Sequence, residues 1–257
     1  MFKCLFLYTF LIFLSVSWTH PNFDKISTAD KEKLESFFNF LIHNSTIGYS
    51  LCGEKPVSIE TFPALSRIPS YYAIQIFVKH PGYSILWNGI ESWQRYSHLF
   101  PSNHFVFRFI SAYNTIVLIN KRATLRVIEE NLDLFQKFSN SSQTAIEFLE
   151  EVCYPKDKEY MIRHNMVLLG ILLGFGRNNS LAFYERHIQK LEGFKLYNTD
   201  DSLNAFMNPG FFIVNNNANK MENKKIRRIL RLAKRNIESN FQNGNYFENF
   251  VYLFTQK

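Results

Sequence analysis

The segment Ile162–Arg186, with the sequence IRHNMVLLGILLGFGRNNSLAFYER, holds the most hydrophobic run of the chain outside its N-terminal end. Its apolar centre, Met166–Phe175, is interrupted only by glycines, and the polar residues Arg177–Ser180 follow it. The run is too short for a membrane-spanning helix, which needs about 20 apolar residues. We therefore predict a buried helical hairpin of Lys156–Phe175 and Ser180–Leu191 at the centre of the fold.

Three glycines shape this hairpin. Gly170 and Gly174 lie four residues apart on one helix face, a spacing that allows two helices to approach closely. Gly174 and Gly176 suit a helix that ends in the left-handed conformation, and Asn179 or Ser180 suits the cap of the next helix. A phosphate-binding loop is excluded, because no Lys-Ser or Lys-Thr pair follows the glycines and the preceding run is helical.

The composition is that of a folded globular protein. Hydrophobic residues make up 46% of the 257 residues and aromatic residues 17%, which excludes a disordered chain. The length suits one large domain or two small ones, and no internal repeat divides it. We predict a single helix-rich α+β domain over residues 20–257, with a small antiparallel sheet.

Apolar residues at helical spacing predict further helices. One is capped by Ser27 or Thr28, one opens after Asn88-Gly89, one runs from Ala123, and one covers Thr144–Val152. The apolar stripe of the first consists of Leu34, Phe37, Phe38, Leu41 and Ile42. Each stripe marks the helix face that should pack on a core.

Alternating and β-branched residues predict strands in the first half of the chain. Phe105–Ile110 and Thr115–Asn120 should form a hairpin that turns at Tyr113-Asn114. Tyr72–Val78 and Tyr83–Trp87 are predicted as a second pair. The glycine-bounded segment Gly48–Ser58 is predicted as an ordered loop or a short strand.

The N-terminal segment has the layout of a secretory signal peptide. Lys3 precedes the apolar run Cys4–Val16, and small or polar residues follow it. We predict that residues 1–19 are removed by cleavage after Ser17 or Thr19. The protein would then be exported, to the periplasm or cell envelope or as a secreted protein. The alternative is an uncleaved membrane anchor through residues 4–18.

Two cysteines, Cys52 and Cys153, remain after removal of this segment. An even pair in an oxidising compartment indicates a candidate disulfide between them. Two buried free thiols are an equally good interpretation, since free cysteine is among the most buried residue types. The sequence leaves both alternatives open.

The strongest interaction signal is a basic amphipathic helix over Lys220–Arg235. Its apolar stripe comprises Ile226, Ile229, Leu230, Ala233 and Ile237, and its basic residues are Lys224, Lys225, Arg227, Arg228, Arg231, Lys234 and Arg235. Such a helix binds an anionic membrane surface, an acidic protein or nucleic acid, or is merely a solvated face. Export argues against nucleic acid as the partner.

Few residues carry a catalytic signal. The histidines show no HExxH spacing and no CxxC occurs, so neither a metal nor a cofactor is predicted. His164 follows Glu159 by about one turn, which suits a general base, although such a histidine is more often a hydrogen-bonded core residue. Cys52 with His80 or His164 could form a nucleophile, but the local context of a cysteine-protease signature is missing and a disulfide would forbid it. No GxSxG or SxxK motif of serine hydrolases is present.

Two motifs carry a resemblance to a known group of proteins. Gly48–Pro56, GYSLCGEKP, and Leu168–Asn179, LLGILLGFGRNN, resemble uncharacterised exported proteins of chlamydia-like intracellular bacteria. The resemblance implies an envelope-located or secreted protein of a host-associated bacterium, with no assigned activity. In a eukaryotic source, Asn44, Asn140 and Asn178 would stand in glycosylation sequons.

These observations predict a non-catalytic envelope or secreted protein whose role is interaction through the basic C-terminal helix. The expected partner is an acidic protein or an anionic membrane surface. The alternative is an exported hydrolase that uses Cys52 or His164.

Overall fold

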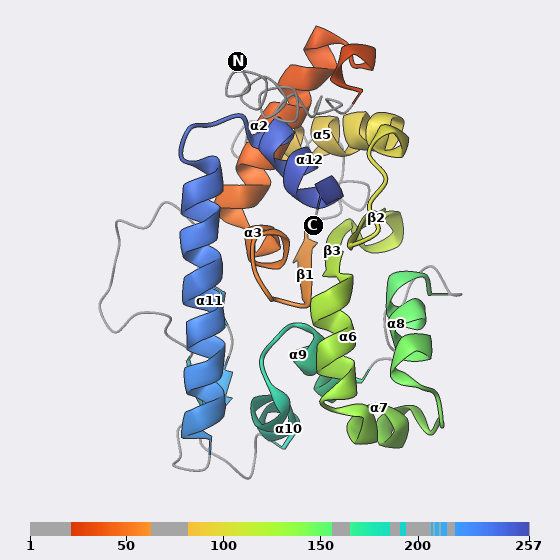
Figure 1. Cartoon of the computed structure of the whole chain (residues 1–257), viewed down its shortest axis with the longest axis vertical. Helices are drawn as coiled ribbons and strands as arrows, with labels where there is room; N and C mark the ends of the chain where they lie inside the picture. The colour runs from red at the N-terminus through yellow and green to blue at the C-terminus, as the bar shows by residue number, and fades with distance from the viewer. Residues whose placement is uncertain are drawn as a thin grey trace, which may run out of the picture.

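The computed structural model describes residues 22–62, 82–155, 165–185, 191–193, 207, 209–210, 212–214 and 219–256 (Figure 1). The predicted signal peptide, the predicted strand Tyr72–Val78 and the residues His80 and His164 lie outside this part of the chain. The described part is helix-rich with a small antiparallel sheet, which confirms the predicted α+β class.

A three-stranded sheet lies at the centre of the fold. Its strands are β1 (Val57–Thr61), β2 (Phe105–Ile110) and β3 (Thr115–Asn120), in the order β1-β3-β2 with both pairs antiparallel. The β2–β3 hairpin was predicted and is confirmed. Its turn contains the 3₁₀ segment Ser111–Tyr113 and Asn114, which has a φ of 47°.

The middle strand faces a core on each side. Ile116 and Leu118 point into one hydrophobic cluster, and Val117 and Ile119 point into the other. Because successive side chains of a strand point to opposite faces, β3 reads as a continuous apolar run and is buried along its whole length. The sheet therefore separates two cores.

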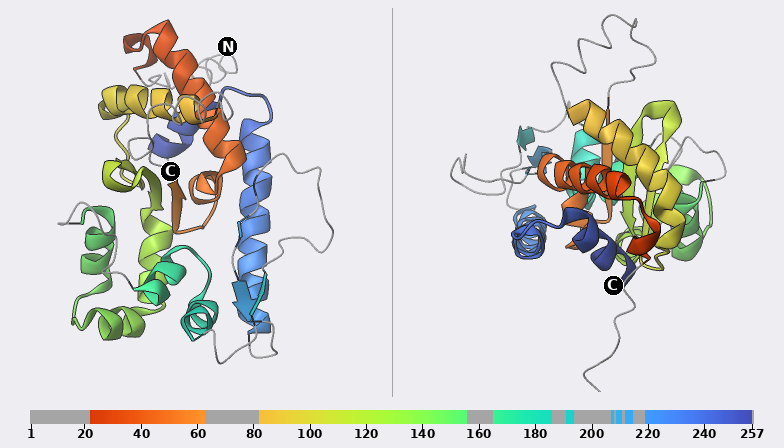
Figure 2. Two further views of the ribbon diagram at one scale, coloured as in Figure 1. Left: turned by 180° about the vertical axis from the view of Figure 1, so that it is seen from behind. Right: turned by 90° about the horizontal axis from the view of Figure 1, so that it is seen from above.

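The first core is built mainly from helices near one end of the molecule. Helices α2 (Thr28–Asn44), α5 (Gly82–Tyr96) and α12 (Tyr246–Gln256) pack together there (Figures 1 and 2). The side chain of Ser27 caps α2, and the predicted stripe of that helix is buried. Aromatic rings dominate, and the ring centroids of Phe38 and Phe250 are 4.0 Å apart.

The second core lies on the opposite face of the sheet. It contains α6 (Lys121–Glu129), α7 (Leu132–Ser139), α8 (Ala145–Cys153) and α9 (Met166–Leu172). Thr144 and Glu147 form a capping box at the start of α8, as the predicted helix over this segment requires.

Of the predicted hairpin of Lys156–Phe175 and Ser180–Leu191, residues 156–164 and 186–190 lie outside the described part of the chain, and the described part contains two consecutive helices. Helix α9 is capped by Asn165, whose Oδ1 accepts from two amides, and α10 (Arg177–Tyr184) follows. Gly174 adopts a φ of 81°, as predicted for the end of the first helix. The second helix begins after Gly176, so the predicted caps Asn179 and Ser180 lie inside it.

Two predicted segments differ from the structure. Gly48–Ser58 was predicted as an ordered loop or a short strand: its end, Val57–Ser58, does begin strand β1, but its start belongs to the short helix α3 (Ile47–Leu51). Tyr83–Trp87 was predicted as a strand and is the first half of α5. The buried residues Leu86, Ile90 and Trp93 have helical spacing, but the apolar run that begins this segment fits either structure when taken alone.

The long helix α11 (Lys220–Phe241) runs along one side of the molecule (Figure 1), and α12 follows it in the chain. Strands β4 (Leu191–Gly193) and β5 (Phe212–Val214) form a second, two-stranded antiparallel sheet. Within the described residues, no helix has both the length and the hydrophobicity that a membrane span requires.

Candidate functional site

Helix α11 is held by a buried stripe whose residues were predicted from their spacing. Ile226, Leu230, Ala233 and Ile237 are buried. The helix packs on α3, and just after α3 a Cβ atom at Gly53 would lie 2.4 Å from the Cβ of Ala233. The glycine therefore permits the close approach of the two segments.

The opposite side of α11 forms a shallow basic groove of about 610 Å³. We call its cationic side chains the basic face, and they are Lys220, Lys224, Arg227, Arg228, Arg231 and Arg235. No acidic residue is among the described residues that line this groove. The sequence predicted five of these six cations.

Two predicted members of the basic helix lie elsewhere. Lys234 has no exposed surface, although its charge made an exposed position the natural expectation. Lys225 is exposed but belongs to another side of α11, where its Nζ lies 3.3 Å from the carboxylate of Glu130, directly after α6. The prediction that Lys225 and Lys234 belong to the binding surface is therefore wrong.

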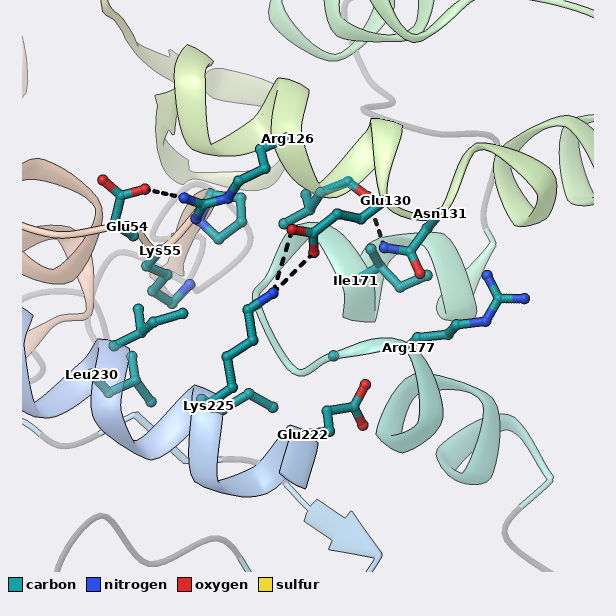
Figure 3. Close-up of a pocket in the computed structure, with 16 residues that line it drawn as sticks. Glu54, Lys55, Arg126, Glu130, Asn131, Ile171, Arg177, Glu222, Lys225 and Leu230 are labelled. Atoms are coloured by element: carbon teal, nitrogen blue, oxygen red, sulfur yellow. Dashed lines mark hydrogen bonds and ion pairs between the residues drawn. The ribbon is translucent and has the colours of Figure 1, made fainter. Parts of the chain in front are cut away.

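Lys225 leads to a pocket of about 270 Å³, which we call the Lys55 pocket (Figure 3). It lies between the segment that joins α3 to β1 and the helices α6, α9, α10 and α11. Its apolar wall consists of Pro56, Val127, Ile171, Ile226, Ile229 and Leu230. Its charged lining residues are Glu54, Lys55, Arg126, Glu130, Arg177, Glu222 and Lys225.

Lys55 is the buried charge of this pocket, with 5% of its surface exposed. Its ammonium group points into the space between α6 and α11 in Figure 3, and it donates to the carbonyl oxygen of Val57. Burial lowers the pKa of Lys55 to about 7, and the negative charge of Glu60 opposes this shift. No ion pair joins Lys55 to a carboxylate within the described residues.

The other cations around the pocket have carboxylate partners. Arg126 lies 2.7 Å from Glu54, which also pairs with Arg122 at 2.6 Å. Arg177 donates from both terminal nitrogens to Asp133, each at 2.7 Å. Two parallel hydrogen bonds of this kind fix the guanidinium geometrically.

Glu222 at the start of α11 binds the N-terminus of α10. Its Oε1 accepts from the backbone amide of Asn178 at 3.2 Å, while its Oε2 is buried without a hydrogen-bond partner in the described structure. Burial raises the pKa of Glu222, and the amides at the start of α10 oppose the shift. Gly176 makes room for this carboxylate, since a Cβ there would lie 2.7 Å from the Cδ of Glu222.

The two cysteines are free and buried, so the structure has two thiols where a disulfide was the alternative. Cys52 belongs to the first core and Cys153 to the second, on opposite faces of the sheet. Burial raises the pKa of Cys153 to about 11, which leaves the thiol protonated and unreactive at neutral pH. Cys52 is 2% exposed and lines neither the basic groove nor the Lys55 pocket.

The other catalytic candidates remain predictions. His164 lies outside the described residues, as does His80, the other histidine considered with Cys52. Within the described residues, no three His, Cys, Asp or Glu side chains lie close enough together to hold a metal ion.

Sequence reasoning missed the residues that build the Lys55 pocket. Lys55 stands in Gly48–Pro56, a segment that drew attention for its glycines, its cysteine and its resemblance to other exported proteins, and not for its lysine. Glu222 looked like an ordinary acidic residue in the first turn of a helix. A lysine directly before a proline and between buried segments was the one available signal, and it does not distinguish a buried lysine from an exposed one.

Comparison of the chain with protein-family models, with curated proteins and with solved structures finds no match. The resemblance to exported proteins of chlamydia-like bacteria therefore stays a prediction.

Proposed function

We propose that this is an exported, non-catalytic protein that binds anionic membrane surfaces through the basic face of α11. The observation that carries the proposal is the set of six cationic side chains on one helix side, with no acidic residue among the described residues that line the groove. The whole chain supports this polarity, with a formal net charge of +7.

The borders of the basic face favour a lipid surface over an acidic protein. Met221 and Leu232 are exposed, at 75% and 55%, although both are apolar. They lie eleven residues apart, which is close to three helical turns, so both sit along the same edge of the basic face. An interfacial helix combines such apolar side chains with cations that contact lipid headgroups.

The size of the expected attraction is moderate. Each Lys or Arg near an anionic bilayer contributes about 1 kcal/mol at physiological ionic strength. Six such residues give at most about 6 kcal/mol, which suits reversible association and predicts a strong dependence on salt.

The test uses vesicles of phosphatidylcholine with 30% phosphatidylglycerol, and vesicles of phosphatidylcholine alone. The full chain should sediment with the anionic vesicles in 50 mM salt and be released in 500 mM salt. The double variant Lys224→Glu with Arg228→Glu should bind at least tenfold more weakly. The matched control, Lys25→Glu with Lys137→Glu, makes the same charge change at exposed residues away from α11.

Equal loss in the control variant would show that net charge alone drives binding, and the proposal would fail. Binding to neutral vesicles with the same affinity would also contradict it. If polyglutamate binds the basic face and anionic vesicles do not, the partner is an acidic protein.

The hydrolase alternative gains no support from the described residues. Its nucleophile Cys52 is buried in the first core, and its other candidate, His164, lies outside the described residues.

A further inference from the structure

The Lys55 pocket contains hydrogen-bond donors that the protein does not satisfy. A lysine ammonium carries three N–H donors. Among the described residues, Val57 is the only acceptor for the side chain of Lys55, through its carbonyl oxygen. Two donors on a group that is 95% buried are thus left for whatever occupies the pocket. Buried polar groups without partners are rare because they are costly.

Within the described residues, the other cations around the pocket have a carboxylate partner and Lys55 has none. Arg126 on α6 pairs with Glu54, and Glu130, directly after α6, pairs with Lys225. On α10, Arg177 pairs with Asp133. Glu222 is committed to the N-terminus of α10.

On β1, Glu60 accepts from the amide and the hydroxyl of Thr46, at 2.7 and 3.1 Å. It acts on Lys55 only through its field. Lys55 therefore has no ion-pair partner among the described residues, and one monoanionic group would supply it.

The pocket is small, and one wall of it, apart from the charged residues named above, is apolar. Ile171, Ile226 and Leu230 line it, together with the ring of Pro56. Its volume of about 270 Å³ exceeds the roughly 150 Å³ of a cavity that holds benzene and lies just below the range of drug-sized sites. A short hydrocarbon body fits this space.

We propose that the Lys55 pocket binds a small amphipathic monoanion, whose carboxylate pairs with the Lys55 ammonium and whose short hydrocarbon body lies against the apolar wall. This site is independent of the basic face, which lies on another side of α11.

The proposal predicts binding coupled to protonation of Lys55. Without a bound anion the pKa of Lys55 is about 7, because burial disfavours its charged form. A bound carboxylate stabilises the charged form and raises that pKa, so binding takes up a proton near neutral pH. Between pH 6.0 and 8.5 the protonated fraction of free Lys55 falls about thirtyfold, and affinity should fall by the same factor.

The probe is hexanoate, which stays ionised across this range, with hexanamide as the neutral analogue. Calorimetric titration of the full chain should show saturable binding of hexanoate at pH 6.0, about thirtyfold weaker binding at pH 8.5, and far weaker binding of hexanamide. The variant Glu222→Gln should keep this pH dependence, because Lys55 and not the buried carboxyl controls it.

Two variants test the site and one serves as control. Lys55→Met keeps most of the length of the side chain, without its charge, and should reduce hexanoate affinity at least tenfold. Ile229→Trp should fill the pocket and block binding while Lys55 stays in place. Lys25→Met makes the same substitution at an exposed residue away from the pocket and should bind as the parent does.

Unchanged binding by Lys55→Met, or equal affinity for hexanamide, would overturn the proposal. The basic-face variant Lys224→Glu with Arg228→Glu should keep its affinity for hexanoate, so failure of the membrane proposal would leave this one standing. Absence of hexanoate binding with selective reductive trapping of hexanal on Lys55 would overturn it in favour of a carbonyl-reactive lysine.

Discussion

Asp30 is the most strongly connected carboxylate in the described structure. It is 4% exposed and receives hydrogen bonds from the hydroxyls of Ser27, Ser92 and Tyr96, at 2.8 to 3.0 Å. Arg95 contributes a further donor at 3.1 Å. The hydrogen bond from Ser27 holds the pKa of Asp30 well below its usual range, and the other donors add to the shift. One carboxylate thus joins the start of α2 to α5.

Asp30→Asn should lower the free energy of unfolding at pH 7 by about 2–4 kcal/mol, because an amide cannot accept from all of these donors. The native pKa lies below the unfolded value near 4, so the ionised group stabilises the fold above pH ~4 and this contribution is lost as the pH falls further. Urea unfolding between pH 2.5 and 7 should show a difference between parent and variant that shrinks on the acid side.

Asp24→Asn is the matched control, since Asp24 is exposed on the 3₁₀ segment Phe23–Lys25. A loss of stability in this control as large as in Asp30→Asn would contradict the role given to Asp30. A pH-independent difference for Asp30→Asn would do so as well.

Residue types alone could not predict which charges are buried. Lys55 and Lys234 are 5% and 0% exposed, and neither differs in sequence from a surface lysine. Their burial depends on which elements pack over them, and local sequence does not contain that information. The apolar positions of α2 could be predicted because a single helix period determines them.

At the scale of elements, three helix ends are stabilised by glutamates from other segments. Each accepts a hydrogen bond from a backbone amide at a helix N-terminus: Glu222 at α10, Glu60 at α3 through Thr46, and Glu35 at α12. The amides of Tyr246 and Phe247 both lie 2.8 Å from the carboxylate of Glu35. A negative charge at a helix N-terminus satisfies orphan donors and complements the helix dipole.

Glu35→Ala should cost about 1–2 kcal/mol and should loosen the first turn of α12 selectively. Hydrogen exchange at the amides of Tyr246 and Phe247 should speed up more than exchange elsewhere in that helix. Glu32→Ala, at an exposed position on α2, is the control and should leave both amides protected. Equal exchange in the two variants would contradict the capping role.

The contact between α9 and α10 gives a second prediction for this scale. A Cβ at Gly170 would lie 2.6 Å from the Oγ of Ser180, which itself donates to the carbonyl of Gly176. Gly170→Leu should therefore overpack the hairpin and cost about 1–3 kcal/mol or more.

Thermal or urea unfolding of Gly170→Leu measures this cost, with Gly210→Leu as the matched control. A Cβ at Gly210 would meet nothing within 4 Å, so this variant should change stability by only about 0.5 kcal/mol. A Gly170→Leu protein of unchanged stability would refute the close packing of the hairpin.

Element types were predictable where a pattern was long or a turn signal was clear. The β2–β3 hairpin turns at Asn114, a residue type that tolerates the left-handed conformation, and α8 begins with a capping box. Prediction failed at α3 and at the start of α5, where short apolar runs fit a strand and a helix equally well. Tertiary packing decided between them.

At the scale of the molecule, both cores are anchored on β3. Leu118 faces the first core and Ile119 the second. If β3 leaves the sheet, both cores are therefore exposed to solvent together. We expect the described residues to unfold in one cooperative transition. Tryptophan fluorescence, which among the described residues reports on Trp87 and Trp93 in α5, and far-ultraviolet circular dichroism should follow coincident unfolding curves.

Two neighbouring substitutions sharpen this expectation. Leu118→Ala and Ile119→Ala should each lower the free energy of unfolding by about 2–5 kcal/mol. Each should shift the midpoints of the fluorescence and circular dichroism curves by the same amount. Fluorescence that responds to Leu118→Ala but not to Ile119→Ala would mean that the cores unfold separately.

The Lys55 pocket was beyond prediction for a reason that belongs to this scale. Its lining comes from four stretches of chain, around Glu54, Arg126, Ile171 and Ile226, which only the complete fold brings together. The basic face, in contrast, lies on one helix, and most of its residues could be predicted from helical periodicity.

Because β3 is buried on both faces, the pattern of apolar and polar residues does not fix its pairing register with β1 and β2. In a half-buried strand, a register shift of one residue would move apolar side chains into solvent. In Ile116–Ile119 the same shift would only replace one apolar side chain by another at each buried position. The polar ends must prevent sliding. The hydroxyl of Thr115 lies 3.0 Å from that of Thr61, and the side chain of Asn120 bonds Ser50, Gly53 and Ala123. The hydrogen bonds of Thr115 and Asn120 thus fix the register of a strand whose apolar interior would accept more than one.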